Sequence, residues 1–199
     1  MKSFILASQS PRRIELIKTF IPDISVMPDD SAEIVKDNES PAETVKRLSL
    51  QKAENISKKT GKDAIVIAAD TVVAIDDMIL GKPKNKDEAY RMLKRLSGKL
   101  HTVYTGVAII DTKTNKKVSD YEKTNVKFCS LSDARIYEYI NTDEPMDKAG
   151  AYGIQGFGAL LISGIDGDYF NVMGLPLCKL GRIMYNDFGI DLLNIERGE

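Results

Sequence analysis

The sequence predicts a mixed α/β fold in which helices flank a central mixed sheet. Runs of β-branched and aliphatic residues alternate along the chain with segments whose apolar residues recur at helical spacing. Several of these segments begin with serine or asparagine followed by proline or acidic residues, which is typical of helix N-termini. With 199 residues, 43% of them hydrophobic, the chain can form a full core, and we expect a single domain over residues 1–199.

The first expected elements are a strand and two helices. An apolar strand is expected over residues 4–7, and Ser10 and Pro11 then provide an N-cap and a first helical residue. The next helix begins at residues 40–43, Ser-Pro-Ala-Glu, which form a capping box with proline at the first helical position, and it extends to residues 60–61. The apolar residues of the first helix are Ile14, Ile17 and Ile21.

The middle of the chain continues the alternation. Residues 64–69 are an unbroken apolar run, as in a strand covered on both faces, and the run ends at Asp70. Residues 72–75 and 78–80 form either a hairpin or a continuation of that strand. A helix capped by asparagine is expected over residues 85–98.

The C-terminal half supplies the remaining elements. Strands over residues 101–111 and 117–128 are joined by a polar turn and precede a helix over residues 131–140. A strand over residues 160–165 and a closing helix over residues 177–188 complete the fold.

The charge and cysteine content exclude several classes of protein. The 28 basic and 29 acidic residues give a net charge of −1, so no global charge attracts the chain to nucleic acid or to an anionic membrane. Cys129 and Cys178 match no zinc or redox spacing and are too few for a disulfide framework. Apolar runs stay far below the roughly 18 residues of a membrane span, and the N-terminal run is too short for a signal peptide. We therefore expect a cytoplasmic protein that does not interact with membranes.

Residues 8–13, Ser-Gln-Ser-Pro-Arg-Arg, lie between the first strand and the first helix. Two hydroxyls, the N–H groups of a helix N-terminus and two guanidiniums favour the binding of a polyphosphate there. The alternative is a capped surface helix with solvated arginines, which explains the second serine and the proline but not the paired arginines. The side chains concerned are Ser8, Ser10, Arg12 and Arg13.

Asp70 and Thr71 follow the apolar run. Strand ends often carry catalytic carboxylates, because ligands of α/β folds gather at the carboxyl edge of the sheet. Asp70 is therefore a candidate general base or metal ligand. The alternative is an aspartate that ends the strand in a turn.

Two lysines are further candidates for binding phosphate. At 100° per residue, Lys52 falls in the middle of the apolar stripe formed by Val45, Leu48 and Ile56. Such a lysine either contacts a phosphate in a cleft or extends its ammonium to the rim of the core. Lys82 lies on a Gly-Lys-Pro turn, where glycine allows close approach and proline stiffens the exit.

Residues 82–99 contain seven Lys or Arg residues and two acidic ones, which is the only local charge bias of interest for nucleic acid. Most of these side chains lie on one expected helix, so a solvated helix face is favoured. The single histidine, His101, excludes metal clusters built from histidines and is expected to be structural.

Residues 144–156 and 166–176 are rich in glycine and predict tightly folded loops. Gln155 offers a donor and an acceptor, as recognition of a base edge requires. A purely structural loop is the alternative.

These segments together resemble the Maf family of nucleoside triphosphate pyrophosphatases, called septum formation inhibitors in older descriptions. The matching segments occur in the family's order over nearly the whole chain, so the resemblance is more specific than any single loop. They are residues 6–13, 68–73, 80–83, 96–99 with His101, 147–156 and 166–176.

The resemblance implies a fold of the inosine triphosphate pyrophosphatase-like kind, with a substrate cleft between two lobes. It implies hydrolysis of a nucleoside triphosphate to the monophosphate and pyrophosphate, with water attacking the α-phosphorus and Asp70 accepting the proton. Glu33 and Asp70 would help to place a divalent cation, magnesium or else manganese. By the same match, the triphosphate would be held by Ser8, Ser10, Arg13, Lys52 and Lys82, and the base would be selected by Arg12, Thr71 and Gln155.

The intact Gly-Ala-Tyr-Gly-Ile-Gln-Gly segment resembles the branch of the family that acts on dTTP and UTP. The expected partner is thus a small nucleotide rather than nucleic acid, and the family also suggests a homodimer. The alternative function is regulation of cell division by binding a partner or nucleic acid. The one sequence feature that favours this alternative function is the basic helix around Lys94 and Arg95.

Overall fold

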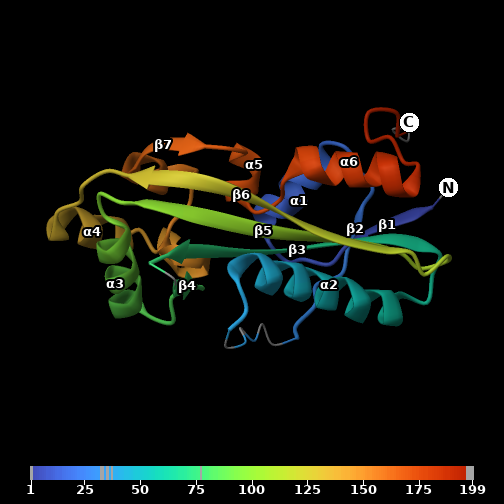
Figure 1. The fold of residues 1–199 in the computed structure, drawn as a ribbon, viewed down its shortest axis with the longest axis horizontal. Helices are drawn as coiled ribbons and strands as arrows, with labels where there is room; N and C mark the ends of the chain where they lie inside the picture. The colour runs from blue at the N-terminus through green and yellow to red at the C-terminus, as the bar shows by residue number, and fades with distance from the viewer. Residues whose placement is uncertain (1, 32–33, 35, 37, 77, 196–199) are drawn as a thin grey trace. The chain divides into compact units, whose positions relative to one another are not determined.

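The computed structural model describes residues 2–31, 34, 36, 38–76 and 78–195 (Figure 1). The strands in this part of the chain are β1 (Ser3–Leu6), β2 (Ser25–Val26), β3 (Ala64–Ile75), β4 (Met78–Leu80), β5 (Leu100–Asp111), β6 (Lys117–Phe128) and β7 (Ile162–Asp166). They form one sheet in the order β2-β1-β3-β5-β6-β7, with β4 paired to β3. β1 is parallel to β2 and β3, whereas β4 is antiparallel to β3 and β7 to β6. The predicted mixed α/β architecture is confirmed.

The helices of the described chain begin and end largely where their local signals predict. In the second helix, Ser40 Oγ accepts from Glu43 N at 3.2 Å, and the Glu43 carboxylate accepts from Ser40 N at 2.9 Å. This helix ends at Gly61, whose φ of 58° places it in the left-handed region. The α-helices are α1 (Pro11–Lys18), α2 (Pro41–Thr60), α3 (Lys86–Leu96), α4 (Asp133–Ile140), α5 (Tyr169–Met173) and α6 (Leu177–Phe188), and the short 3-10 helices are η1 (Glu144–Asp147), η2 (Ala149–Ala151) and η3 (Gly156–Leu161).

Several predicted boundaries were wrong. The strand expected to end at Asp70 continues to Ile75, because the buried β-branched residues beyond Asp70 extend the same strand. β4 pairs with the end of β3, so both interpretations of residues 72–80 hold, a continuation and a hairpin. The strand expected over 160–165 begins at Ile162, since the two leucines before it belong to η3.

The apolar spacing also overestimated one helix and missed two short elements. α1 ends at Lys18, so Ile21 lies beyond the helix although it is buried. β2 and α5 were not predicted, because two and five residues are too few for a periodic pattern.

The chain forms two compact units. Unit 1 comprises Met1–Asp70, Thr105–Glu122 and Gly174–Glu199. Within it, α2 lies on one side of β1, β3 and β5, and α6 lies on the other (Figure 1). The core between α2 and the strands contains Ile5, Ala7, Ala53, Ile56, Val66, Ala68, Ala108 and Ile110.

The close contact between α2 and β5 depends on Gly106. A Cβ atom at this position would lie 2.1 Å from the carbonyl oxygen of Val45, a distance that atoms cannot reach without a backbone shift. Glycine therefore lets α2 lie directly against β5. This contact holds Lys52, about two helical turns beyond Val45, beside the sheet.

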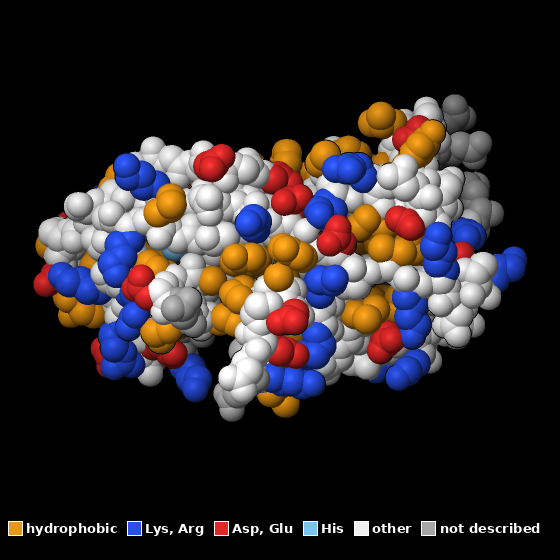
Figure 2. Space-filling view, in the orientation of Figure 1, with side chains coloured by type: hydrophobic (Ala, Val, Ile, Leu, Met, Phe, Trp, Pro, Cys, Tyr) orange, Lys and Arg blue, Asp and Glu red, His pale blue; other side chains and the backbone are white. Residues whose placement is uncertain are grey.

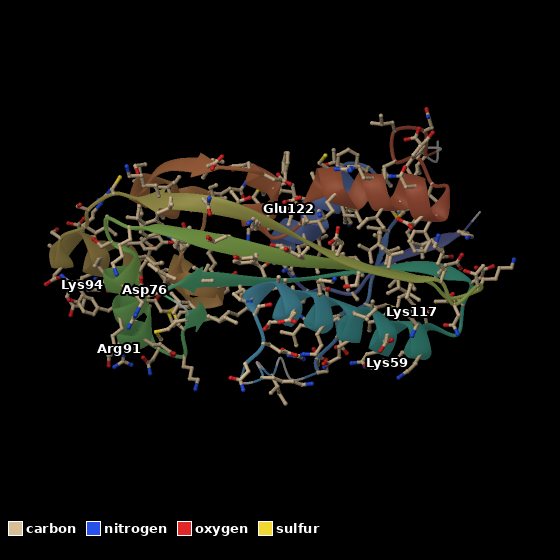
Figure 3. All side chains as sticks on the ribbon, in the orientation of Figure 1. Lys59, Asp76, Arg91, Lys94, Lys117 and Glu122 are labelled. Atoms are coloured by element: carbon tan, nitrogen blue, oxygen red, sulfur yellow. The ribbon has the colours of Figure 1, made fainter. Side chains whose placement is uncertain are left out.

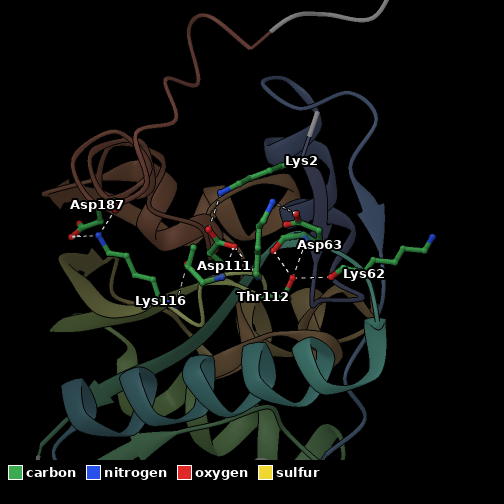
Figure 4. A network of polar contacts seen from close by, with 10 residues as sticks. Lys2, Lys62, Asp63, Asp111, Thr112, Lys116 and Asp187 are labelled. Atoms are coloured by element: carbon green, nitrogen blue, oxygen red, sulfur yellow. Dashed lines mark hydrogen bonds and ion pairs between the residues drawn. The ribbon is translucent and has the colours of Figure 1, made fainter.

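A polar network in unit 1 fastens the N-terminal segment to the turn after β5 (Figure 4). Lys2 Nζ donates to Asp111 Oδ2 at 2.7 Å, and Asp111 Oδ1 accepts from the N–H of Lys113 at 3.0 Å. Thr112 Oγ1 donates to the carbonyl oxygen of Lys62 at 2.8 Å. The bond from Lys2 is the main reason that the pKa of Asp111 lies below its usual value.

Unit 2 comprises Thr71–Tyr104 and Lys123–Met173. Its helices α3 and α4 contact one another and pack, with η2, on the ends of β3, β5 and β6 that belong to this unit. This core includes Met92, Leu93, Leu96, Phe128, Ile136, Tyr139, Ile140 and Tyr152. None of the helices in the described part of the chain has the length and hydrophobicity of a membrane span.

His101 is buried in the core of unit 2. Its ring packs edge-on against Phe128 and Tyr152, and its Nε2 lies 2.7 Å from Tyr152 Oη in a hydrogen bond. Among the described residues Nδ1 has no hydrogen-bond partner, so a proton added there would be buried without an acceptor. Burial accordingly lowers the pKa of His101 from 6.5 to about 4. The structure thus supports the structural role expected for this residue.

The shifted pKa of His101 predicts a loss of stability in mild acid. Below pH 6.5 the unfolded chain binds a proton at His101 and the folded chain does not, so the free energy of unfolding falls between pH 6.5 and 4. The pKa difference predicts a loss of about 2 kcal/mol between pH 7 and 5. Urea unfolding at the two pH values measures it. A His101→Gln variant should lose this share of the pH dependence, and an equal pH dependence in the variant would contradict the assignment, because the chain has no other histidine.

Candidate active site

The segment after β1 brings the first predicted phosphate ligands together. Ser8 is buried, and its Oγ accepts from the N–H of Ser10 at 3.2 Å and from Arg13 Nη1 at 3.5 Å. Ser10 occupies the N-cap position of α1, but its side chain makes no capping bond. The hydroxyl of Ser10 is therefore not explained by the helix cap, which favours the phosphate-binding interpretation. Arg12, in the first turn of α1, is half-buried.

Arg13 is not a solvated arginine, so the alternative of a free surface helix was wrong for this residue. Its Nε donates to the carbonyl oxygen of Gly174 at 2.7 Å, and its Nη1 donates to that of Ala69 at 2.8 Å. The second bond connects α1 to β3 at the residue before Asp70, and the first connects α1 to the segment before α6. Arg13 thus places a fixed positive charge at Ser8 and orders the backbone that presents Asp70.

Asp70 and Lys52 form a buried ion pair in unit 1. Lys52 Nζ lies 2.6 Å from Asp70 Oδ1, and the residues are only 7% and 4% exposed. Lys52 does not extend to the rim of the core, so that alternative was wrong, and Asp70 does not end its strand in a turn. An ammonium at this distance favours the carboxylate form of its partner, which a general base and a metal ligand both need.

Arg47, one helical turn and a half before Lys52, is a charged residue that the sequence patterns did not single out. Its guanidinium binds the Glu39 carboxylate through two bonds, Nε to Oε1 and Nη2 to Oε2, both 2.7 Å long. Nη2 also donates to the carbonyl oxygen of Ile34 at 2.7 Å. The pKa of Arg47 is raised, chiefly by Glu39, with a smaller contribution from the charge of Asp70. The position of Arg47 on the same helix as Lys52 was the sequence signal that could have identified it.

The remaining predicted residues belong to unit 2, except Glu33, which lies outside the described residues. Thr71 follows Asp70 in β3 and is half-buried, whereas Lys82, after β4, and Gln155, before η3, are exposed. The segments of Lys82 and Gln155 are connected, because Gly150 N donates to the carbonyl oxygen of Gly81 at 3.0 Å.

Gly150 is required at this connection. Its φ is 69°, and a Cβ atom would lie 2.9 Å from the side chain of Val73. The glycine-rich loop therefore packs directly on β3. This close packing fits a loop built for a specific shape rather than a flexible connection.

Several basic side chains on and just after α3 pair with neighbouring acids; Figure 3 labels Arg91 and Lys94 of this helix together with Asp76. Lys94 pairs with Asp133 at 2.5 Å, and Lys99 pairs with Asp76 at 3.0 Å. On the face in Figure 2, basic and acidic side chains are interspersed. A groove of about 640 Å³ over α3 and β4 includes Arg91 but holds none of the predicted site residues. These pairs favour the solvated-face interpretation over a nucleic-acid surface.

Asp70 offers a hard carboxylate oxygen, the type of ligand that magnesium prefers in proteins. Among the described residues there is no group of three or more His, Cys, Asp or Glu side chains that could hold a metal by themselves. Magnesium is commonly held by one or two carboxylates together with substrate phosphates and water, so a site with a single described carboxylate would need the substrate to complete the ligands. Asp70 is thus a suitable carboxylate ligand.

Comparison with known proteins identifies the family. A model of the family described as Maf-like protein matches residues 3–186. The chain belongs to the Maf family. Among Maf relatives, a protein of Alkaliphilus oremlandii (strain OhILAs) named dTTP/UTP pyrophosphatase is 54% identical over 193 residues, covering 97% of this chain and all of that protein. A protein of the same name from Thermoanaerobacter sp. (strain X514) is 50% identical, covering 95% and 98% of the two chains.

A solved structure also resembles the fold of this Maf protein. The structure of a HAM1 protein from Coxiella burnetii has a TM-score of 0.50 and 16% sequence identity, and the match covers 81% of each chain. At this identity the likeness concerns the fold alone. It agrees with the predicted architecture.

Proposed function

We propose that this protein is a nucleoside triphosphate pyrophosphatase that hydrolyses dTTP and UTP to the monophosphate and pyrophosphate. The observation that carries the proposal is the high identity, over nearly the full chain, to relatives named dTTP/UTP pyrophosphatase. The buried pair of Asp70 and Lys52 beside Ser8 and Arg13 supports it, because these groups suit the hydrolysis of a polyphosphate. Such an enzyme removes these nucleotides from the cytoplasmic pool.

In the proposed reaction, a water oxygen bonds to the α-phosphorus and the bond to the α,β-bridging oxygen breaks. Asp70 takes the proton of the attacking water, and pyrophosphate leaves. The negative charge of the triphosphate and of the transition state is balanced by fixed cations and hydroxyls. The groups proposed for this role are Ser8, Ser10, Arg13, Lys52 and Lys82.

A divalent cation, for which we propose magnesium, would be held by Asp70 and Glu33 together with substrate phosphates. When bound, it stabilises negative charge on the phosphoryl oxygens and lowers the pKa of bound water. The protein's own contribution is to keep the Asp70 carboxylate in place through Lys52 and the backbone fixed by Arg13.

Selection of the base is assigned to Arg12, Thr71 and Gln155. Uracil and thymine present an N–H donor and a carbonyl acceptor side by side, and the amide of Gln155 has the complementary acceptor and donor. The exposed position of Gln155 on a packed loop supports this role.

The test is incubation of the purified protein with magnesium and dTTP, UTP, CTP, GTP or 7-methyl-GTP, followed by chromatography of the products. We expect pyrophosphate together with dTMP or UMP. A preference for 7-methyl-GTP would keep the reaction and contradict the role of Gln155 in selecting a pyrimidine. No turnover of any nucleotide by folded protein would contradict the proposed function.

A further inference from the structure

The loop that carries Gln155 is held by one pair of side chains. Tyr139, near the end of α4, is buried, and its Oη donates to Glu144 Oε1 at 2.9 Å. Burial, together with the bond to Glu144, raises the pKa of Tyr139, so the hydroxyl keeps its proton at neutral pH. We call this pair the Tyr139–Glu144 clamp.

The clamp binds the backbone on both sides of Gln155. Before it, Gly153 N donates to the tyrosine Oη at 3.2 Å. After it, Phe157 N donates to Oε2 of the glutamate at 2.9 Å, and Gly158 N donates to Oε1 at 3.0 Å. Hydrogen bonds to a charged group are stronger than neutral ones, so the carboxylate fixes the start of η3 firmly.

The glycines of the loop are adapted to these bonds. Gly156 has a φ of 65°, and a Cβ atom there would lie 2.5 Å from Glu144 Oε2. A Cβ atom at Gly158 would lie 2.2 Å from the carbonyl oxygen of Gly153. Glycine at position 156 thus leaves room for the carboxylate, and glycine at position 158 lets the backbone approach Gly153 and the Tyr139 hydroxyl. The spacing of glycines around Gln155 therefore serves the clamp.

A glutamine amide selects a base only when it is held in place. Its oxygen and nitrogen match the N–H and carbonyl of uracil, but the same amide rotated by 180° matches cytosine instead. The backbone on both sides of Gln155 sets the position from which the amide meets the base edge, so a mobile loop would present the amide from several directions and a fixed loop presents it from one.

We propose that Tyr139 and Glu144 are positioning residues that hold the Gln155 loop for recognition of a 4-oxo pyrimidine, an inference that rests on the proposed function. Neither side chain needs to touch the nucleotide. Their effect passes through the backbone on the two sides of Gln155.

The test compares binding of the α,β-imido analogues of UTP and CTP by calorimetry, so that no turnover is needed. In the wild-type protein the UTP analogue should bind more tightly. Selectivity is the dissociation constant of the CTP analogue divided by that of the UTP analogue. Glu144→Gln should reduce this ratio about tenfold, because the amide nitrogen would face a backbone N–H that the carboxylate oxygen accepts in the wild type. Tyr139→Phe should reduce the ratio in the same direction. Glu138→Gln is the matched control, since Glu138 is exposed and pairs with Arg135, three residues earlier, at 3.1 Å, and it should leave the ratio unchanged.

A double variant separates positioning from a general structural effect. If the clamp acts through Gln155, Gln155→Ala should lower the ratio and adding Glu144→Gln should lower it no further. Loss of selectivity in Gln155→Ala, with full selectivity in Glu144→Gln and Tyr139→Phe, would overturn the inference and leave the proposed function standing. Failure of the wild-type protein to hydrolyse UTP or dTTP would instead contradict the proposed function, while the binding ratios would still decide on the clamp.

Discussion

Replacing Asp70 with asparagine is expected to lower kcat for UTP hydrolysis by about two orders of magnitude or more. Asparagine keeps the size of the side chain and an oxygen that accepts from Lys52, which lies 2.6 Å from Asp70 Oδ1. It cannot take the proton of an attacking water, and loss of a general base costs about 10²–10⁴ in rate. Pyrophosphate release at saturating UTP and magnesium measures the effect.

Asp63→Asn is the control for this substitution. Asp63 is exposed just before β3 and pairs with Lys113 at 3.3 Å, so its loss should leave kcat unchanged. The unfolding midpoint of each variant shows whether it is folded. Turnover within a few-fold of the wild-type rate in a folded Asp70→Asn protein would contradict the assignment of the base.

The elements with local signals could be predicted from the sequence. α2 has a capping box at its start and a left-handed glycine after its end, and both signals act within a few residues. The continuation of β3 through Asp70 was one of two alternatives that the sequence left open, because no local signal decides between them. A charged residue normally marks the end of a buried strand, and what keeps Asp70 inside one is Lys52, 18 residues earlier.

The same distinction between local signals and long-range contacts applies to the candidate site. The resemblance to the Maf family implied which side chains would act on a nucleotide, an assignment that stays a prediction, and residue patterns alone left each one with a structural alternative. The pairing of Arg47 with Glu39 and the clamp of Tyr139 with Glu144 depend on tertiary packing that no pattern carries. The spacing of the glycines was visible in the sequence, but the side-chain pair that they contact was not. The predicted substrate cleft and homodimer stay predictions.

Lys52→Met is expected to lower the free energy of unfolding by about 3–5 kcal/mol, because it leaves the Asp70 carboxylate buried without its ammonium. Replacing both members, with Lys52→Met and Asp70→Leu, should restore most of that loss, since an apolar pair of similar volume is about as stable as a buried ion pair. Urea unfolding of the wild type, the single variants and the double variant measures the coupling between the two residues. Lys58→Met, on the exposed face of α2, is the control and should change the free energy of unfolding by less than about 0.5 kcal/mol.

The double variant is expected to be stable and inactive, and this combination decides why the chain keeps a buried charge pair. If the pair existed for stability, the apolar replacement would be less stable than the wild type by the full cost of the single variant. Recovery of stability together with loss of pyrophosphate release would assign the pair to the reaction, because only the reaction needs a carboxylate held by an ammonium at this place in β3. A double variant as unstable as Lys52→Met would contradict the assignment of the pair to the reaction and would show that the pair is needed for stability.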